Sequence, residues 1–283
     1  MNILISGMGL IGGSLCKALK KYTEHKVIGY DINSDVEKLA LSENSIDQIF
    51  NGDYSNIDII IICMYPEICE KYFYSIISKI EKYTLVTDVC GIKGEMSERL
   101  HQSAISHGVE YIPIHPMAGK EVGGYSNSSA DLYIRANMVI TPFEDSDRKK
   151  TEILSKISEN IGFRKIVITT PQEHDTMIAY TSQLAHIVSS AYVKSPSLDK
   201  ECGFSGGSFQ DMTRIATMNE DMWTSLFMQN RKNLESELSI LIENLEKYRE
   251  TLQNNDSEEM KRLIKEGTNL KLENLKKRIG EPN

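Results

Sequence analysis

The sequence lacks the marks of several protein classes. Its five cysteines among 283 residues are scattered and form no C-x-x-C pair, so we expect reduced thiols, a cytoplasmic location, no disulfide framework and no bound metal. Lysine and arginine number 32 against 40 aspartates and glutamates; because a phosphate backbone requires clustered cations, we expect no nucleic-acid partner. The longest aliphatic run, residues 57–64, is too short to span a bilayer. We also expect no membrane anchor and no signal peptide, because an apolar strand pattern begins at residue 2.

Two patterns of apolar residues divide the chain. Short apolar runs alternate with helical patterns up to residue 170, which is typical of a doubly wound parallel sheet with helices on both faces. The expected strands lie near 2–6, 26–30, 58–63, 84–88, 110–114 and 136–141. From Pro171 onward, apolar residues follow helical spacing only, notably over 171–193, 219–252 and 256–278. We therefore expect an α/β domain over 1–170 and an all-helical domain over 171–283.

A glycine-rich turn follows the first expected strand. Its six residues have the pattern G-x-G-x-x-G: Gly7, Met8, Gly9, Leu10, Ile11 and Gly12. With a strand before it and a helix after it, the turn predicts a Rossmann-type dinucleotide site, in which Gly9 lets the backbone approach the pyrophosphate and the free helix N–H groups bind it. The alternative is an ordinary glycine turn of an α/β domain.

An acidic residue strengthens the dinucleotide interpretation. Asp31 ends the second expected strand, nineteen positions after Gly12. A carboxylate there accepts a hydrogen bond from a ribose 2′-OH and repels a 2′-phosphate. The sequence therefore predicts NAD as the cofactor rather than NADP.

His115 stands at the carboxyl end of the strand expected over 110–114. Ligands of open α/β sheets bind at that edge, and imidazole titrates near neutrality, so His115 can take a hydroxyl proton while hydride leaves the same carbon. The alternative is a histidine that only hydrogen-bonds a loop. His174, near the start of a helical segment, is expected to act as a hinge or a cap and not in catalysis.

Four motifs together resemble the prephenate dehydrogenase family. They are Gly7-x-Gly9-Leu10-Ile11-Gly12-Gly13-Ser14, His115-Pro116-Met117-Ala118-Gly119-x-Glu121, Ser182-Gln183-Leu184-Ala185-His186 and Asp211-Met212-Thr213-Arg214-Ile215-Ala216. The resemblance covers nearly the whole chain. It implies NAD-dependent oxidative decarboxylation of prephenate to 4-hydroxyphenylpyruvate in tyrosine biosynthesis, or, as the alternative, of arogenate to tyrosine.

The resemblance also implies roles for individual residues. His115 would be the catalytic histidine that polarises the ring 4-hydroxyl. Arg214 would bind a substrate carboxylate, for which the planar guanidinium fork is suited; the alternative is an ion pair with Asp211 on the same helical face. His186 and Glu121 would lie at the rim and entrance of the substrate pocket.

Three positions depart from the family pattern. Gly91 stands where many members have a serine that hydrogen-bonds the catalytic histidine, and Gln210 stands where an arginine is common. Gln183 replaces a histidine of the substrate pocket and keeps hydrogen-bonding capacity without a charge. These departures concern orientation and substrate preference more than the reaction itself.

The helical domain would bind the substrate and make a homodimer. An apolar stripe follows one expected helix: Leu234, Leu238, Leu241, Ile242, Leu245 and Tyr248. The stripe packs either within its own domain or across a homodimer.

Two other functions remain open at this point. A β-hydroxyacid or imine dehydrogenase shares the two-domain plan but usually carries a lysine base on the first long interdomain helix, where residues 171–193 offer only Lys194 at their end. An NAD-sensing regulator would have an inert site, and the presence of both His115 and Arg214 argues against it.

Overall fold

The computed structural model describes residues 1–120 and 122–279 and divides the chain into two compact units, Met1–Arg231 and Lys232–Asn283. The first unit contains a six-stranded parallel sheet in the order β3-β2-β1-β4-β5-β6. Its strands are β1 (Asn2–Ser6), β2 (Lys26–Tyr30), β3 (Gln48–Ile49), β4 (Ile59–Ile62), β5 (Leu85–Asp88) and β6 (Glu110–Tyr111). This order confirms the predicted Rossmann fold, whose ligand crevice lies where the strand order reverses, between β1 and β4.

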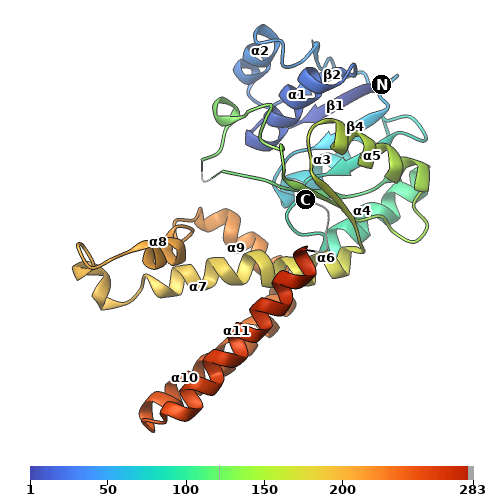
Figure 1. Cartoon of the computed structure of the whole chain (residues 1–283). Coiled ribbons are helices and arrows are strands. Elements are labelled where there is room, and N and C mark those ends of the chain that lie inside the picture. Colours follow the sequence, from blue (N-terminus) through green and yellow to red (C-terminus); the bar gives the residue numbers. More distant parts are fainter. Residues whose placement is uncertain (121, 280–283) are drawn as a thin grey trace. The chain divides into compact units, whose positions relative to one another are not determined.

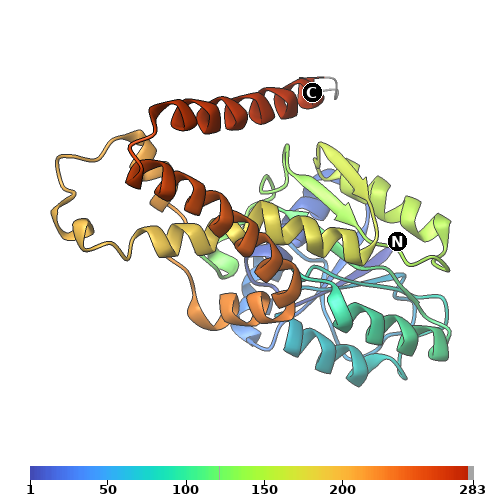
Figure 2. The same ribbon diagram turned by 90° about the horizontal axis from the view of Figure 1, so that it is seen from below.

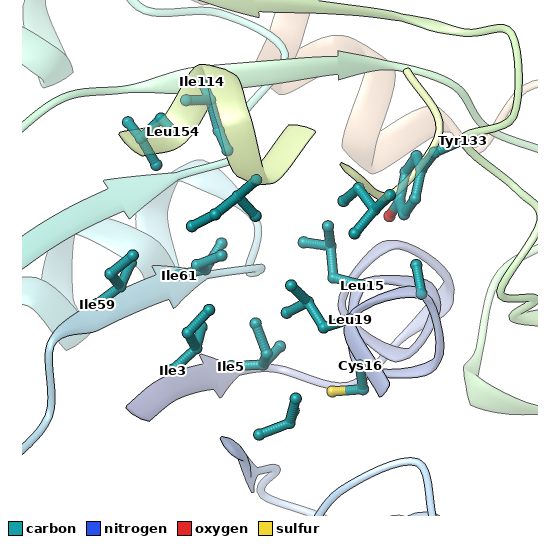
Figure 3. Packing of buried hydrophobic residues seen from close by; sticks show 14 of the residues in the cluster. Ile3, Ile5, Leu15, Cys16, Leu19, Ile59, Ile61, Ile114, Tyr133 and Leu154 are labelled. Atoms are coloured by element: carbon teal, nitrogen blue, oxygen red, sulfur yellow. The ribbon is translucent and has the colours of Figure 1, made fainter. Parts of the chain in front are cut away.

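Helices cover both faces of this sheet (Figure 1). They are α1 (Leu10–Tyr22), α2 (Ser34–Ser42), α3 (Pro66–Ile76), α4 (Gly94–His107) and α5 (Arg148–Asn160). Side chains of β1 and β4 alternate between two buried clusters: one includes residues of α1 and α5, and the other residues of α3 and α4. Figure 3 shows the first cluster, where Ile5 and Ile61 lie near Leu15 and Leu19 of α1. The isoleucines of β4 are all buried, as expected for a strand covered on both faces.

A second sheet was not predicted. It contains β7 (Ile114–Met117), β8 (Asn137–Ile140) and β9 (Lys165–Ile168), with β7 antiparallel to β8 and β8 parallel to β9. The expected strand 110–114 divides at Pro113, which has no N–H to donate, so β6 belongs to the parallel sheet and β7 to the second sheet. The strand predicted over 136–141 is therefore β8 of this second sheet. Apolar runs predict strands but do not say which strands pair.

The rest of the first unit is helical, as predicted from Pro171 onward. Helix α6 (Pro171–Ile178) continues through a π-helical turn (Ala179–Gln183) into α7 (Leu184–Tyr192), and the chain then forms α8 (Gly207–Thr213) and α9 (Glu220–Gln229). The helix predicted over 219–252 is interrupted at Asn230, between α9 and α10.

The second unit is a helical hairpin. Helices α10 (Arg231–Gln253) and α11 (Ser257–Ile279) are joined by a turn in which Asn255 is left-handed (φ 53) and Asp256 accepts a hydrogen bond from the N–H of Glu259. Figure 2 shows the two helices diverging from this turn. Within residues 1–120 and 122–279, no helix is long and apolar enough to cross a bilayer.

Candidate active site

The glycine turn between β1 and α1 is tight at Gly7 and Gly12 and open at Gly9. Gly7 has φ +92, and a Cβ there would lie 2.6 Å from the Cys63 carbonyl oxygen. A Cβ on Gly12 would lie 1.9 Å from the Gly7 oxygen, so both positions require glycine. At Gly9, in contrast, an added Cβ meets no atom within 4 Å. The backbone at Gly9 is therefore open to a ligand, as a bound pyrophosphate requires.

The start of α1 offers an anion site. Gly9 is the N-cap and supplies no side chain to satisfy the first N–H groups, and the first turn begins with the apolar residues Leu10 and Ile11. Those N–H groups and the positive end of the helix dipole favour a phosphate. The donor set of this turn thus fits a dinucleotide.

Asp31 links this turn to the end of β2. One of its carboxylate oxygens accepts from the N–H of Met8 at 2.7 Å, and the other accepts from the N–H of Asn33 at 2.9 Å. A carboxylate has about four acceptor positions, so each oxygen can still accept from a ribose hydroxyl. Asp31 therefore both fixes the turn and can bind the adenosine ribose.

His115 lies on β7, paired with Val139 of β8. Its ring is half-buried, and its Nδ1 lies 2.9 Å from Nε2 of His174. Burial, and then the nearby His174 and Lys93, hold the pKa of His115 well below its ordinary value. His115 is therefore neutral near pH 7, and a neutral imidazole can accept a proton.

His174 is a site residue that the sequence did not reveal. It is buried on α6, and its Nδ1 lies 2.7 Å from Oδ1 of Asp175. Burial lowers the pKa of His174, although the hydrogen bond to Asp175 opposes that shift. The adjacent His174 and Asp175 were visible in the sequence, but the contact with His115, 59 positions away, was not. The prediction that His174 acts as a hinge or a cap is not what these contacts indicate.

Asp175 joins α6 to the start of α4. Its Oδ1 accepts from the N–H of Lys93 at 2.9 Å, and its Oδ2 accepts from the N–H of Gly94 at 2.6 Å. Its own carbonyl accepts from the amide of Asn230 at 2.8 Å. Asp175 is therefore held by both α4 and the residue that follows α9.

A buried ion pair lies next to the two histidines. The Lys93 ammonium is 3.1 Å from Oδ1 of Asp88, both side chains are fully buried, and the ammonium also donates to the carbonyl of Ile114, the residue before His115. The Tyr111 hydroxyl donates to Oδ2 of Asp88 at 2.6 Å. Burial raises the pKa of Tyr111 well above its ordinary value, so this hydroxyl remains a donor.

Gly91 faces the imidazole of His115. A Cβ on Gly91 would lie 3.8 Å from Nε2 of His115 and 3.7 Å from Leu226 Cδ2 on α9, which is ordinary contact distance. The position can thus accept a small side chain, but in this chain it supplies no hydroxyl. The edge of His115 that carries Nε2 is left uncovered by residue 91.

The other predicted pocket residues lie on the helical segments. Gln183 is buried, and its amide donates to the Leu226 carbonyl at 3.0 Å and accepts from Asn230 at 2.8 Å. His186 on α7 stacks on Trp223 of α9 with ring centroids 3.8 Å apart. Thus Gln183 and His186 both contact the α9 segment, Gln183 through its amide and His186 through its ring.

Of the two remaining predicted residues, Arg214 and Glu121, only Arg214 lies among the described residues. Arg214 is the exposed C-cap residue of α8, and Figure 1 shows α8 beside the end of α7 that lies away from the strands. Glu121 lies outside the described residues. The structure therefore brings together His115, His174 and Asp175, with Lys93 and Gly91 beside them, but places Arg214 on a separate helical segment.

Comparisons with known proteins agree with this architecture. Residues 15–177 match the family model "Prephenate dehydrogenase, nucleotide-binding domain", and residues 170–266 match "Prephenate dehydrogenase, dimerization domain". A prephenate dehydrogenase of Bacillus subtilis is 27% identical over 274 residues, covering 93% of this chain and 73% of the relative. A cyclohexadienyl dehydrogenase of Zymomonas mobilis is 25% identical, covering 96% of this chain and 95% of the relative.

A solved structure is similar over almost the whole chain. Prephenate dehydrogenase from Aquifex aeolicus, in complex with hydroxyphenyl propionate and NAD+, superposes with a TM-score of 0.85 at 26% identity, covering 96% of this chain and 98% of that one. The first family model alone spans more than half of the 283 residues. The chain belongs to the prephenate dehydrogenase family.

Proposed function

We propose that this protein oxidises prephenate with NAD, releasing CO2 and forming 4-hydroxyphenylpyruvate. The observation that carries the proposal is the imidazole of His115, held at Nδ1 by His174 and facing Gly91 with its Nε2 edge, in a chain with the glycine turn and fold of this family. A neutral imidazole is the form that can act as a base.

NAD is the cofactor. The backbone at Gly9 and the first turn of α1 would hold its pyrophosphate, and Asp31 its adenosine ribose. NAD supplies the acceptor for a hydride from ring C4 of the substrate.

The chain's own contribution to the reaction is alignment and a base. We assign to Nε2 of His115 the hydrogen bond from the ring 4-hydroxyl, so that the oxygen gains electron density as the C4–H bond breaks. Departure of CO2 from ring C1 then returns an electron pair to the ring, and the oxygen keeps or regains its proton as a phenol. Because this step makes an aromatic ring, few further groups are needed.

Substrate carboxylates require a cation. We assign this role to Arg214, because its guanidinium stays charged and binds a carboxylate through two parallel hydrogen bonds. His186 and Glu121 are assigned to the rim and entrance of the pocket. The amide of Gln183 is already bonded at both ends to the α9 segment, which supports an indirect role for Gln183 in substrate binding, through the placement of α9.

The alternative substrate is arogenate, which carries an ammonium where prephenate carries a keto group. Gln183 stands where the family has a histidine and carries no charge, which supports arogenate as the alternative substrate. The test is NADH formation by the purified protein with prephenate and with arogenate, each with NAD and with NADP. We expect turnover with prephenate and NAD, and loss of that turnover in His115→Asn by the roughly 10²–10⁴-fold typical of a missing acid or base. Turnover with arogenate alone would replace the proposed substrate, and a fully active His115→Asn would remove the base.

We also propose a homodimer, formed through the C-terminal helices, in the cytoplasm. Large apolar side chains of the second unit are exposed, including Ile242, Leu245, Leu252, Ile264 and Leu270. Apolar patches of this kind mark protein interfaces, and a second copy of the chain is the occupant that the dimerization-domain match supports. The unpaired cysteines support a reducing compartment.

A further inference from the structure

We propose that Asp175, acting through His174, fixes the tautomer of His115 so that Nε2 carries the lone pair that meets the substrate. Asp175 and His174 are then positioning residues for the base. The proposal rests on the proposed function for its kinetic test, whereas the tautomer itself can be measured without any substrate.

The first step concerns the Asp175 carboxylate. Three donors converge on its two oxygens: the N–H groups of Lys93 and Gly94, and Nδ1 of His174. A carboxylate only accepts hydrogen bonds, so the proton of neutral His174 must lie on Nδ1. The two backbone donors fix the carboxylate in place, since they belong to the start of α4.

The second step transmits this constraint to His115. With its proton on Nδ1, neutral His174 presents an unprotonated Nε2, which can only accept. That nitrogen lies 2.9 Å from Nδ1 of His115, so Nδ1 of His115 must be the donor. The remaining nitrogen of neutral His115, Nε2, is then the acceptor.

Burial is the main reason that both rings are neutral, and the surrounding charges modify its effect on their pKa values. The buried ammonium of Lys93 disfavours a further positive charge on either imidazole, while the carboxylates of Asp88 and Asp175 favour one at His174. The net effect is a lowered pKa for each histidine. The neutral tautomers of His174 and His115 are therefore the forms present at neutral pH.

The departure at residue 91 makes this orientation more important. Gly91 has no hydroxyl to hydrogen-bond His115, although a Cβ there would lie only 3.8 Å from Nε2. The hydrogen bond to His174 thus orients the His115 ring from its Nδ1 side. His174 lies on α6, which Asn230 also holds by donating to the Asp175 carbonyl.

A purely structural role for Asp175, as the cap of α4, is the competing explanation. In Asp175→Asn, one carboxylate oxygen is replaced by an NH2 group, which donates, so the side chain can no longer accept from all three donors. With the NH2 group turned toward His174, Nδ1 of His174 would have to accept, and the tautomers of both histidines would reverse. We expect kcat to fall by about 10²–10⁴-fold, since replacing the orienting aspartate of a serine-protease triad by asparagine lowers kcat about 10⁴-fold through the wrong tautomer.

A double-mutant cycle separates the two explanations. In His174→Gln, the glutamine carbonyl can accept directly from Nδ1 of His115 without Asp175, so we expect a loss below about 10-fold. Adding Asp175→Asn to that variant should then change kcat by less than about 3-fold, because the two residues act as one unit. The α4 cap is lost equally in both backgrounds, so an equal kcat loss in both would overturn the proposal.

Nitrogen-15 NMR of histidine-labelled protein gives a readout without substrate. We expect Nε2 of His115, assigned by its absence in His115→Asn, to be unprotonated in the parent protein and protonated in Asp175→Asn. The matched control is Asp145→Asn, which removes the carboxylate 2.7 Å from His101 of α4 and should leave the His115 signals and kcat unchanged. A protonated Nε2 in the parent protein would overturn the proposal even if prephenate is turned over. The expected NMR result without turnover would contradict only the proposed function.

Discussion

The Lys93 ammonium lies 3.1 Å from the Asp88 carboxylate, and neither side chain is exposed to solvent. The pair connects the end of β5 to the start of α4, and its ammonium donates to the carbonyl of Ile114, the residue before His115 on β7. Charges removed from water need both partners and their hydrogen bonds to be tolerated. The position of His115 therefore depends on a buried ion pair that is out of reach of a ligand in solvent.

Removing one charge of this pair should destabilise the fold. In Lys93→Met the Asp88 carboxylate stays buried without its cation, and we expect the free energy of unfolding to fall by about 3–5 kcal/mol. Urea denaturation measures this change. Lys38→Met, which removes a pair to Asp35 at the exposed surface, is the control and should cost at most about 1 kcal/mol. Similar losses of unfolding free energy in Lys93→Met and Lys38→Met would contradict the prediction that burial makes the Lys93 charge costly to remove.

The acid limb of the pH profile should reflect the lowered pKa of His115. The base must be neutral, and its pKa lies well below the ordinary value of 6.5 because of burial, His174 and Lys93. As pH falls, kcat/KM should therefore hold past pH 6.5 and decline only as pH passes the lowered pKa. Stability should decrease at higher pH than activity does, between pH 6.5 and the lowered pKa, because there the unfolded chain binds protons that the folded histidines do not. An acid limb above pH 6.5, at saturating NAD, would contradict this assignment.

A serine at residue 91 should fit and should aid the reaction. Its Cβ would make only ordinary contacts with Leu226 and His115, and its hydroxyl could hydrogen-bond near the reacting oxygen. We expect Gly91→Ser to raise kcat by about 3–10-fold, the equivalent of one hydrogen bond. Gly91→Ala adds the same Cβ without the hydroxyl and should leave kcat close to the parent value. A gain in both variants, or a loss in both, would show that the hydroxyl is not the cause.

Alanine substitutions at Gly12 and Gly9 should affect different properties, stability as well as NAD binding in the first case and NAD binding alone in the second. In Gly12→Ala the new Cβ would overlap the Gly7 oxygen, so we expect a lower melting temperature together with lost NAD binding. In Gly9→Ala the Cβ enters open space, so the melting temperature should hold while NAD binds more weakly. Calorimetric unfolding and titration with NAD measure both effects. A stable Gly12→Ala with normal NAD affinity would contradict the turn geometry.

Loss of Arg214 should act on substrate binding. Removal of a charged hydrogen-bond partner costs about 1.5–3 kcal/mol, so we expect Arg214→Ala to raise KM for prephenate by about 10–100-fold with a smaller change in kcat. Arg214→Lys keeps the charge but loses the pair of parallel hydrogen bonds, so its KM for prephenate should lie between those of the parent protein and Arg214→Ala. The neighbouring Gln210→Ala is a control for the α8 segment. An unchanged KM in Arg214→Ala would withdraw the carboxylate assignment.

Local patterns predicted NAD as the cofactor and a set of residues to hold it. The glycine turn and Asp31 belong to one β-α-β unit, so their spacing along the chain already sets their spacing in space. The parallel sheet was predicted from the alternation of apolar runs and helical patterns, but the pairing of its strands was not. His115 was found because a strand end is visible in the sequence.

Contacts between distant segments could not be predicted. The partner of His115 is His174, on a helix that follows both the second sheet and α5, and no spacing rule joins them. The same holds for Gln183, whose amide meets Asn230 across 47 positions. The second sheet was missed for a related reason: the short strands β6 and β7 form one apolar run, and only Pro113 marks the change of sheet.

The π-helical turn between α6 and α7 holds one extra residue between the helices that carry two histidines. A regular helix advances about 100° per residue, and a π-turn contains one residue more than the α-helical spacing requires. His174 precedes the turn and points to His115, whereas His186 follows it and stacks on Trp223. Because the wider turn absorbs this residue, deleting one residue within 179–183 would restore α-helical spacing and leave the angle of α7 about the axis of α6 nearly unchanged, so both histidines would keep their partners.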